Sequence, residues 1–262
     1  MKNATIIFIC LLFFVSPFQV AEAQENCMNF GLKAGIAYGT PIGPAEKGAT
    51  GSPGLGPILG IFMDYGFTSK WGFQTDVYYV QKRSKFSSPV TDQQYSYPYN
   101  PISNPDTTVF VDTKFTGTVT GEFNNRYIEW PVLGYYQIGE NYRLMLGPYF
   151  SYLLEAGNTG VANGIVGFGN LSVEDEPFDE SININEFDMG LIGAIRYDTK
   201  VGINCEFRIS TGLLSVYKPS YQLREEAVRN VYLQLTAGYR LHSLCKRPDS
   251  EKDLLRNENE LR

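Results

Sequence analysis

Residues 187–215 read FDMGLIGAIRYDTKVGINCEFRISTGLLS, and this stretch decides the fold. In its second half, apolar residues alternate with small or polar ones from residue 201 to residue 210. A period of two is the mark of a β-strand whose two faces meet different surroundings. Residues 187–197 alternate in the same way, and only the turn Asp198-Thr199-Lys200 separates the two halves. Two strands joined by a tight turn and flanked by long polar loops are typical of a transmembrane β-barrel hairpin.

The same pattern recurs along the rest of the chain. The eight expected strands are residues 30–38, 57–67, 71–83, 126–138, 142–154, 187–197, 201–215 and 230–241. The connections after the second, fourth and sixth strands are turns of about three residues, whereas the others are long, as in outer-membrane barrels. We therefore expect an all-β fold, a transmembrane up-and-down antiparallel barrel of eight strands. The short turns and both termini would face the periplasm, and the long loops, including 84–125 and 155–185, would be extracellular.

The ends of the chain indicate export and a polar tail. Residues 1–23 contain Lys2, an apolar core and the small-x-small sequence Ala21-Glu22-Ala23, which together predict a cleaved signal peptide. The apolar core is shorter than the roughly 20 residues that a spanning helix needs. No long apolar run follows it, so a closed barrel is the remaining way to cross a membrane. We expect a barrel domain at residues 24–241 and a polar periplasmic tail at residues 242–262.

Composition and charge exclude some classes of protein. The formal net charge is −6, which disfavours nucleic-acid binding, since nucleic-acid-binding domains are normally basic. Tyrosine, phenylalanine and glycine are abundant, and the mean hydropathy is −0.19. Outer-membrane barrels have such values because only alternate residues face lipid. We expect a monomer in the outer membrane of a Gram-negative-type bacterium, surrounded by lipid and lipopolysaccharide.

Charged residues of the inward parity predict a filled lumen. They are Lys33, Asp64, Asp76, Glu129, Arg143, Asp188, Arg196, Glu206, Arg208 and Arg240. An eight-stranded barrel is just wide enough for side chains to fill it. Buried opposite charges should pair, because an unpaired buried ion is costly. We therefore favour a network of ion pairs that blocks the lumen over the alternative of a charge-lined pore.

Catalytic, cofactor and metal sites are not expected. The one histidine, His242, follows the last strand at the periplasmic end, opposite to the outer leaflet where barrel enzymes that act on lipid have their general base. The acidic run Glu174-Asp175-Glu176 has oxygen ligands that suit calcium, but it lacks EF-hand spacing and reads as a solvated loop. A cluster of Tyr95, Tyr97 and Tyr99 in the long loop 84–125 either binds an extracellular protein or glycan or orders its own loop.

Three cysteines remain after the signal peptide, and two of them flank the barrel. Cys27 precedes the first strand and Cys245 follows the last. Closure of a barrel makes these strands neighbours, so a Cys27–Cys245 disulfide would lock the seam in the oxidising periplasm. Two unpaired thiols remain the alternative, because the geometry decides whether the sulfurs can meet. Cys205 is expected to face lipid and to stay free.

Three segments carry a family resemblance. RYIEWPVLGYYQI at residues 126–138, YRLMLGPYFSYLL at residues 142–154 and FGLKAGIAYG at residues 30–39 resemble the "porin family", or PorT-like, outer-membrane β-barrel domain. The resemblance covers the mature chain to about Leu241 and implies the barrel architecture, and it says little about activity. The polar tail departs from such barrels, which often stop at the last strand.

These observations lead to one favoured function and two alternatives. We expect a non-enzymatic outer-membrane protein whose extracellular loops bind a partner. A small porin or channel for solutes is the first alternative. A lipid-modifying barrel enzyme is the second and less favoured one.

Overall fold

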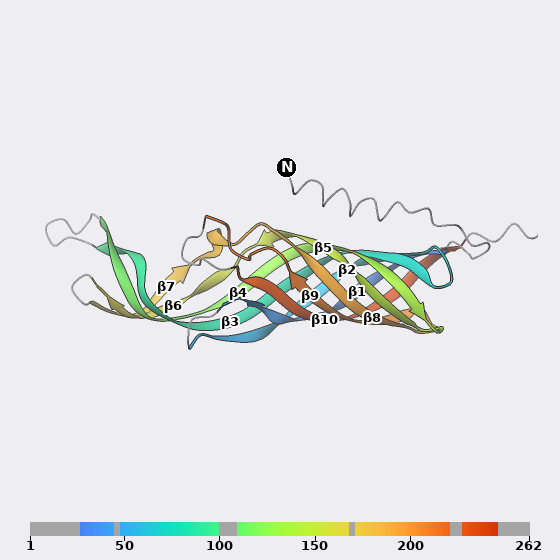
Figure 1. Ribbon diagram of the computed structural model, residues 1–262, viewed down its shortest axis with the longest axis horizontal. Helices are drawn as coiled ribbons and strands as arrows, with labels where there is room; N and C mark the ends of the chain where they lie inside the picture. Colours follow the sequence, from blue (N-terminus) through green and yellow to red (C-terminus); the bar gives the residue numbers. More distant parts are fainter. Residues whose placement is uncertain (1–26, 45–47, 100–108, 168–170, 221–226, 246–262) are drawn as a thin grey trace, which may run out of the picture.

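Eight antiparallel strands close into a barrel. A computed structural model of the 262-residue chain describes residues 27–44, 48–99, 109–167, 171–220 and 227–245 (Figure 1). The ring consists of β1 (Cys27–Ile42), β2 (Thr50–Gly66), β3 (Trp71–Tyr99), β4 (Val109–Ile138), β5 (Tyr142–Glu155), β8 (Phe187–Asp198), β9 (Ile203–Gly212) and β10 (Arg229–Cys245). Each strand pairs with its neighbours in chain order, and pairing of β1 with β10 closes the ring. The predicted eight-stranded up-and-down barrel is confirmed.

Short turns join the strands at one end of the barrel. Threonine side chains cap two of them: Thr68 Oγ1 accepts a hydrogen bond of 3.0 Å from the Trp71 N–H, and Thr199 Oγ1 accepts one of 3.1 Å from the Ile203 N–H. The third turn places Gly139 at φ 60°, a left-handed conformation that glycine adopts without steric cost. Since short turns mark the periplasmic end of such barrels, this end faces the periplasm.

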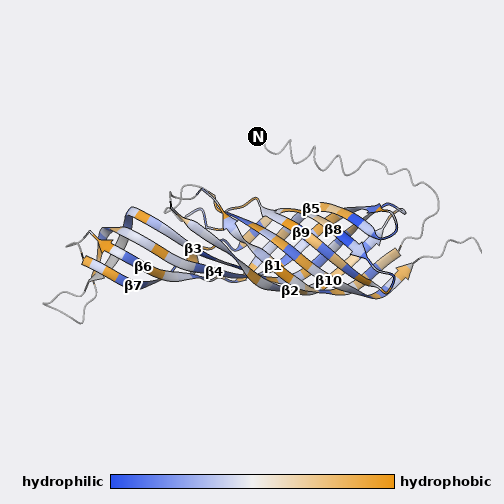
Figure 2. Ribbon diagram, turned by 90° about the horizontal axis from the view of Figure 1, so that it is seen from below, coloured by the Kyte–Doolittle hydropathy of each residue, from blue (hydrophilic) through white to orange (hydrophobic). Residues whose placement is uncertain are grey.

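Side chains alternate strictly between the two sides of the barrel wall. In β9, every second residue from Ile203 onward is exposed, and the residues between them are buried. The exposed positions of the wall are apolar, with Leu59 59% exposed, Leu146 67% and Leu235 55%. Figure 2 shows the resulting lattice of hydrophobic and hydrophilic stripes. Hydrocarbon around the barrel accounts for an exposed apolar belt, and the polar side chains then turn inward.

Two regions expected to be polar loops form a sheet above the barrel. β3 and β4 continue well beyond the barrel wall, and β6 (Asn158–Val166) and β7 (Leu171–Asp179) add two strands beside β4. The resulting four-stranded sheet, in the order β3–β4–β6–β7, projects from the extracellular end (Figure 1). The expected long extracellular connections at 84–125 and 155–185 are thus strand for most of their described length.

Proline does not interrupt the upper part of β3. The last pair of β3 with β2 joins Ser87 to Thr50, so above this level β3 has β4 as its only strand partner in the described structure. Pro98 pairs in register with Phe110 of β4 on that strand. Proline is tolerated in an edge strand, where its missing N–H costs no ladder hydrogen bond.

An apolar cap covers the extracellular mouth of the barrel. It consists of Phe123, Ile184, Val216, Tyr217 and Val228, all buried. Ile184 follows the short 3₁₀ helix η1 (Ser181–Asn183), and its backbone bridges to Tyr217 of the β9–β10 connection. The Val216 N–H donates a 2.7 Å hydrogen bond to the Val228 carbonyl and ties both sides of this connection together. The cap closes the top of the lumen with buried, mostly apolar side chains.

The first and last strands of the barrel meet at its periplasmic rim. β10 extends to Cys245, four residues past the expected end at Leu241, and pairs with β1 down to Cys27. The predicted signal peptide at 1–23 and the tail from residue 246 onward lie outside the described residues. No helix within the described ranges has the length and apolar character needed to span a membrane.

Candidate functional site

The lumen holds three tiers of charged side chains, and the lowest lies near the periplasmic turns. Arg196 of β8 reaches Asp64 of β2 at 3.2 Å and Asp198 at 2.7 Å. Arg143 of β5 contacts the same two carboxylates, at 3.3 and 3.1 Å. Gln74 of β3 accepts a 2.6 Å hydrogen bond from Arg196 and links this tier to the next. Two cations and two anions from three strands, together with Gln74 of a fourth, therefore form one connected group.

The middle tier is the most deeply buried. Lys33 Nζ lies 2.9 Å from Asp76 and 2.6 Å from Glu206, and Arg208 contacts both of these carboxylates as well. All four side chains are at most 1% exposed. A buried ion is tolerated only when it is paired and hydrogen-bonded, and this square of two cations and two anions meets that requirement.

The upper tier is built around one lysine. Lys82 of β3 lies 3.0 Å from Glu129 and 3.3 Å from Asp188. Hydrogen bonds from Tyr149 to Asp188 (3.0 Å) and from Tyr78 to Glu129 supply donors that a second cation would otherwise provide. The rings around the lysine ammonium, at 4.9, 5.0 and 5.8 Å, belong to Tyr127, Tyr149 and Tyr232. Cation–π contacts of this kind add to the stabilisation of a desolvated cation.

Most of the predicted lumen residues meet in these tiers, and three positions differ from the prediction. Nine of the ten predicted residues lie in the tiers, but Arg240 lies at the periplasmic mouth, beside the turn that contains Lys200. Lys82 and Asp198 were missed. Lys82 has the same parity as Asp76 in β3, so the alternation of the strand was enough to predict that it faces inward. Asp198 was assigned to a turn and was therefore not considered.

The tiers and the cap leave little room for water in the lumen. Gln74, Glu129 and Arg208 are each 0% exposed, whereas a water-filled channel would expose such side chains. Inward-facing glycines leave space for the tyrosine rings that occupy the rest of the lumen. A Cβ at Gly190, for example, would lie 2.6 Å from Tyr149 Cε1. The lumen is thus occupied by side chains from the periplasmic turns to the apolar cap.

The sheet above the barrel has two different faces. One face continues the lumen side and buries Val90, Phe115, Val166 and Val173 against one another. The opposite face exposes alternate threonines of β4, Thr116, Thr118 and Thr120. The register places Ser87 beside Thr120, and Asn163 beside Thr118. These five residues form a surface of hydroxyl and amide groups, which we call the hydroxyl face.

Both edges of this sheet contain a β-bulge at an aspartate. Asp92 in β3 and Asp175 in β7 adopt left-handed conformations, with φ of 54° and 51°, where the strand register shifts. A side chain on the neighbouring strand holds each bulge: the Asp92 N–H donates to Thr116 Oγ1 at 3.1 Å, and the Asp175 N–H donates to Asn163 Oδ1 at 2.8 Å. Bulges and charges on edge strands prevent pairing with other chains. The faces of the sheet, rather than its edges, are thus available for recognition.

The predicted loop residues are strand residues. The backbones of Tyr95, Tyr97 and Tyr99 lie at the end of β3, paired with β4, while their side chains lie outside the described residues. The acidic run 174–176 lies in β7, and the described residues contain no cluster of three or more metal-ligating side chains.

Two carboxyl groups near η1 differ in environment. Hydrogen bonds from Ser181 lower the pKa of Asp179, whereas partial burial raises the pKa of Glu180.

The cysteines lie as follows. Cys205 is free and exposed on the outer wall of β9. Cys27 is disulfide-bonded, and Cys245 is its partner in the β1–β10 register. The side chain of Cys245 lies outside the described residues, so the Cys27–Cys245 pair stays a prediction.

The sealed barrel agrees with a sequence family. The family described as an outer membrane protein beta-barrel domain matches residues 22–218. The chain belongs to this family. As an outer membrane β-barrel protein, it resides in the outer membrane of Gram-negative cells, in agreement with the resemblance seen in the sequence.

Solved structures with a similar barrel include two outer-membrane proteins. Ail, the attachment invasion locus protein of Yersinia pestis, is 13% identical at a TM-score of 0.40, covering 83% of this chain and 100% of that one. OprG from Pseudomonas aeruginosa is 10% identical at a TM-score of 0.39, covering 86% and 99%. No curated protein sequence matches this β-barrel protein.

Proposed function

We propose that this β-barrel protein is a non-enzymatic surface receptor, in which a blocked barrel anchors an extracellular sheet that binds a partner. The observation that carries the proposal is the combination of a filled lumen with an ordered sheet outside the membrane. The chain extends β3 and β4 by more than a dozen residues each beyond the lumen tiers and adds β6 and β7 beside them. A barrel that served passage of solutes would gain nothing from either feature.

The hydroxyl face is the surface that suits recognition. Its threonine, serine and asparagine side chains offer both donors and acceptors of hydrogen bonds. Thr116, Thr118 and Asn163 are exposed, and their strands hold them on one rigid surface. A neutral ligand rich in hydroxyl groups matches this chemistry, so we infer that the partner is a glycan. Binding of a protein that carries no glycan is the competing outcome of the test below.

The non-enzymatic part of the proposal rests on the environment of the reactive groups. His242 lies at the periplasmic end of β10, paired with Phe30, away from the outer leaflet. The buried carboxylates of the lumen are all engaged by cations or hydrogen-bond donors, as in Glu129, which contacts Lys82 and Ser151. Neither arrangement offers a free general base beside a space for a substrate, as acid–base catalysis requires.

The test is a glycan-binding assay with the purified mature protein in detergent micelles. The variant Thr118→Val/Thr120→Val removes two hydroxyls and keeps the side-chain shape and the β propensity, and it leaves Thr116, which holds the Asp92 bulge, in place. We expect it to lose about tenfold or more in affinity, since each lost hydrogen bond contributes on the order of 1 kcal/mol. The control Thr211→Val removes an exposed hydroxyl from the barrel wall and should bind as the wild type does.

Two results would contradict the proposal. The first is equal binding by the Thr118→Val/Thr120→Val variant and the control. The second is saturable binding of a protein without glycans that this variant retains, because the hydroxyl face would then not be the recognition surface.

A further inference from the structure

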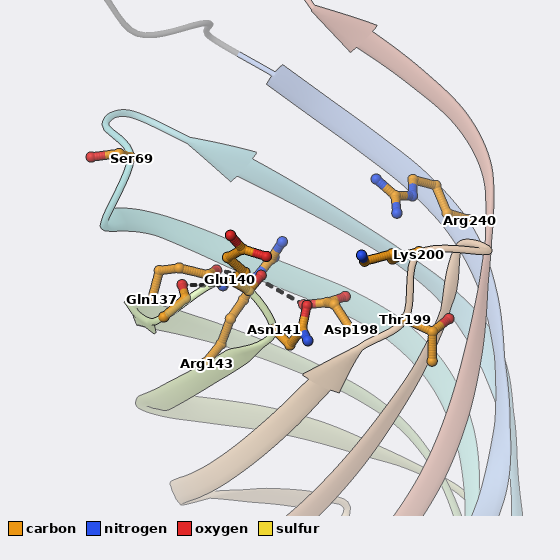
Figure 3. Close-up of a pocket in the computed structure, with 10 residues that line it drawn as sticks. Ser69, Gln137, Glu140, Asn141, Arg143, Asp198, Thr199, Lys200 and Arg240 are labelled. Carbon is orange, nitrogen blue, oxygen red and sulfur yellow. Dashed lines mark hydrogen bonds and ion pairs between the residues drawn. The ribbon is translucent and has the colours of Figure 1, made fainter.

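A pocket opens at the periplasmic mouth of the barrel, outside the lumen tiers. Its volume is about 470 Å³, and three turns contribute to its wall (Figure 3). Ser69 comes from the β2–β3 turn, Glu140 from the β4–β5 turn and Lys200 from the β8–β9 turn. Arg143 and Arg240 complete the charged part of the lining. Pockets that hold small ligands have volumes in this range.

Three charged side chains of this pocket differ from those of the tiers above. Figure 3 shows Lys200 and Arg240 on one side, with the Lys200 ammonium directed into the space, and Glu140 on the other side, near Arg143. In the part of the chain that the structure describes, Lys200, Arg240 and Glu140 make no ion pair. In the tiers above, by contrast, every described cation has an acidic partner. Lys200, Arg240 and Glu140 therefore keep charges that no described ion pair neutralises, with the two cations on the side of the pocket away from Glu140.

The floor of the pocket also has unused hydrogen-bonding capacity. Arg143 Nη1 and Asp198 Oδ2 are buried atoms of its lining that form ion pairs but no hydrogen bond of good geometry. Buried polar groups normally have such partners, and an exception calls for an explanation. A ligand or water molecules in the pocket would supply the missing partners.

We propose that this pocket binds a short zwitterionic peptide, with a carboxylate between Lys200 and Arg240 and an ammonium or amide group toward Glu140. The pocket faces the periplasm, so a small peptide in that compartment can reach it. Its volume suits a few residues of an extended peptide rather than a folded surface. The partner class is therefore a short peptide with a free carboxylate and a free amine, and a soluble cell-wall peptide of this chemistry serves as the probe.

The experiment measures binding of soluble muropeptides, released from purified sacculi by muramidase, to the full-length mature protein in micelles. We expect saturable binding to one site, and no binding of the same disaccharide after its peptide has been removed. The variant Lys200→Gln/Arg240→Gln should weaken binding by about tenfold or more, since charge-assisted hydrogen bonds are lost. The charge-conserving variant Lys200→Arg/Arg240→Lys should retain binding within about threefold, which would show that the neutral variant fails through charge rather than through misfolding.

Lys70 provides the matched control, because it is an exposed cation in the β2–β3 turn that does not line the pocket. Lys70→Gln should bind as the wild type does. Four results would overturn the proposal: the absence of saturable binding, an equal loss in Lys70→Gln, equal binding of the peptide-free disaccharide, or muropeptide binding only after residues 249–262 have been deleted. The last result would mean that the tail of this chain occupies the pocket.

Discussion

At the scale of single residues, the interior depends on the sharing of counter-ions. Lys33 and Arg208 both contact Asp76 and Glu206, so each carboxylate is held by two cations. Such a square stabilises all its members or none, since removal of one ion leaves its partners buried and under-compensated. The same reasoning explains why the upper tier, with one lysine and two carboxylates, recruits tyrosine hydroxyls as donors.

The first prediction concerns Lys33. The variant Lys33→Met keeps much of the side-chain volume and removes the charge, and we expect it to lower the free energy of unfolding by about 3–5 kcal/mol, as breaking a buried ion pair does. Urea titration of the folded barrel in micelles, followed by tryptophan fluorescence, measures the change. Lys218→Met is the control, because Lys218 is partly exposed and lies 3.9 Å from Glu186. An equal, small effect of both variants would show that the middle tier does not stabilise the barrel.

At the scale of elements, the seam between β1 and β10 is where the barrel closes. The two strands pair over their whole length, with one register shift beside Gly31. Closure brings the first and last strands of the mature chain together, so a covalent bond at the seam would link the ends of the barrel. A disulfide that closes so long a loop would be expected to contribute about 2–4 kcal/mol.

The second prediction concerns the thiols at this seam. Alkylation of the denatured, non-reduced mature protein should modify Cys205 alone, and prior reduction should expose Cys27 and Cys245 as well. Intact mass spectrometry distinguishes these states. Cys27→Ser and Cys245→Ser should each release one additional thiol in the non-reduced protein. Modification of all three cysteines without reduction would rule out the seam disulfide.

At the scale of the whole molecule, the barrel is closed along its axis and extended outside the membrane. Three ion-pair tiers and an apolar cap of buried side chains occupy the lumen in succession. Above the cap, the β3–β4–β6–β7 sheet stands free, with protected edges (Figure 1). These two properties separate anchoring, which the barrel performs, from recognition, which we assign to the sheet.

The third prediction follows from the closed lumen. The purified mature protein should give no steady conductance in planar lipid bilayers, because an eight-stranded barrel filled by side chains leaves no water-filled path. A larger porin inserted under identical conditions serves as the positive control. Reproducible steps on the nanosiemens scale from the pure protein would contradict this and favour the channel alternative.

The candidate site shows where reasoning from the sequence was sufficient and where it stopped. Parity along the strands was enough to bring Lys33, Asp76 and Glu206 together, since a closed barrel has only one interior. It was not enough for Asp198, because the length of a turn decides whether a residue at its start still points inward. Arg240 has the inward parity but lies at the periplasmic mouth rather than in a tier. These two locations differ only in height along the barrel axis, which parity does not give.

The sequence by itself determined the strand order, the side of the barrel wall on which each residue lies and the location in a membrane. Alternation with a period of two is a local property, because hydrocarbon outside and a polar interior impose it separately on each strand. Only the tertiary structure decided which charges meet in one tier, how β6 and β7 extend the sheet and which turns surround the periplasmic pocket. These features depend on the stagger and curvature of strands around the ring. Stagger and curvature arise from pairing between distant segments, and no single segment encodes them.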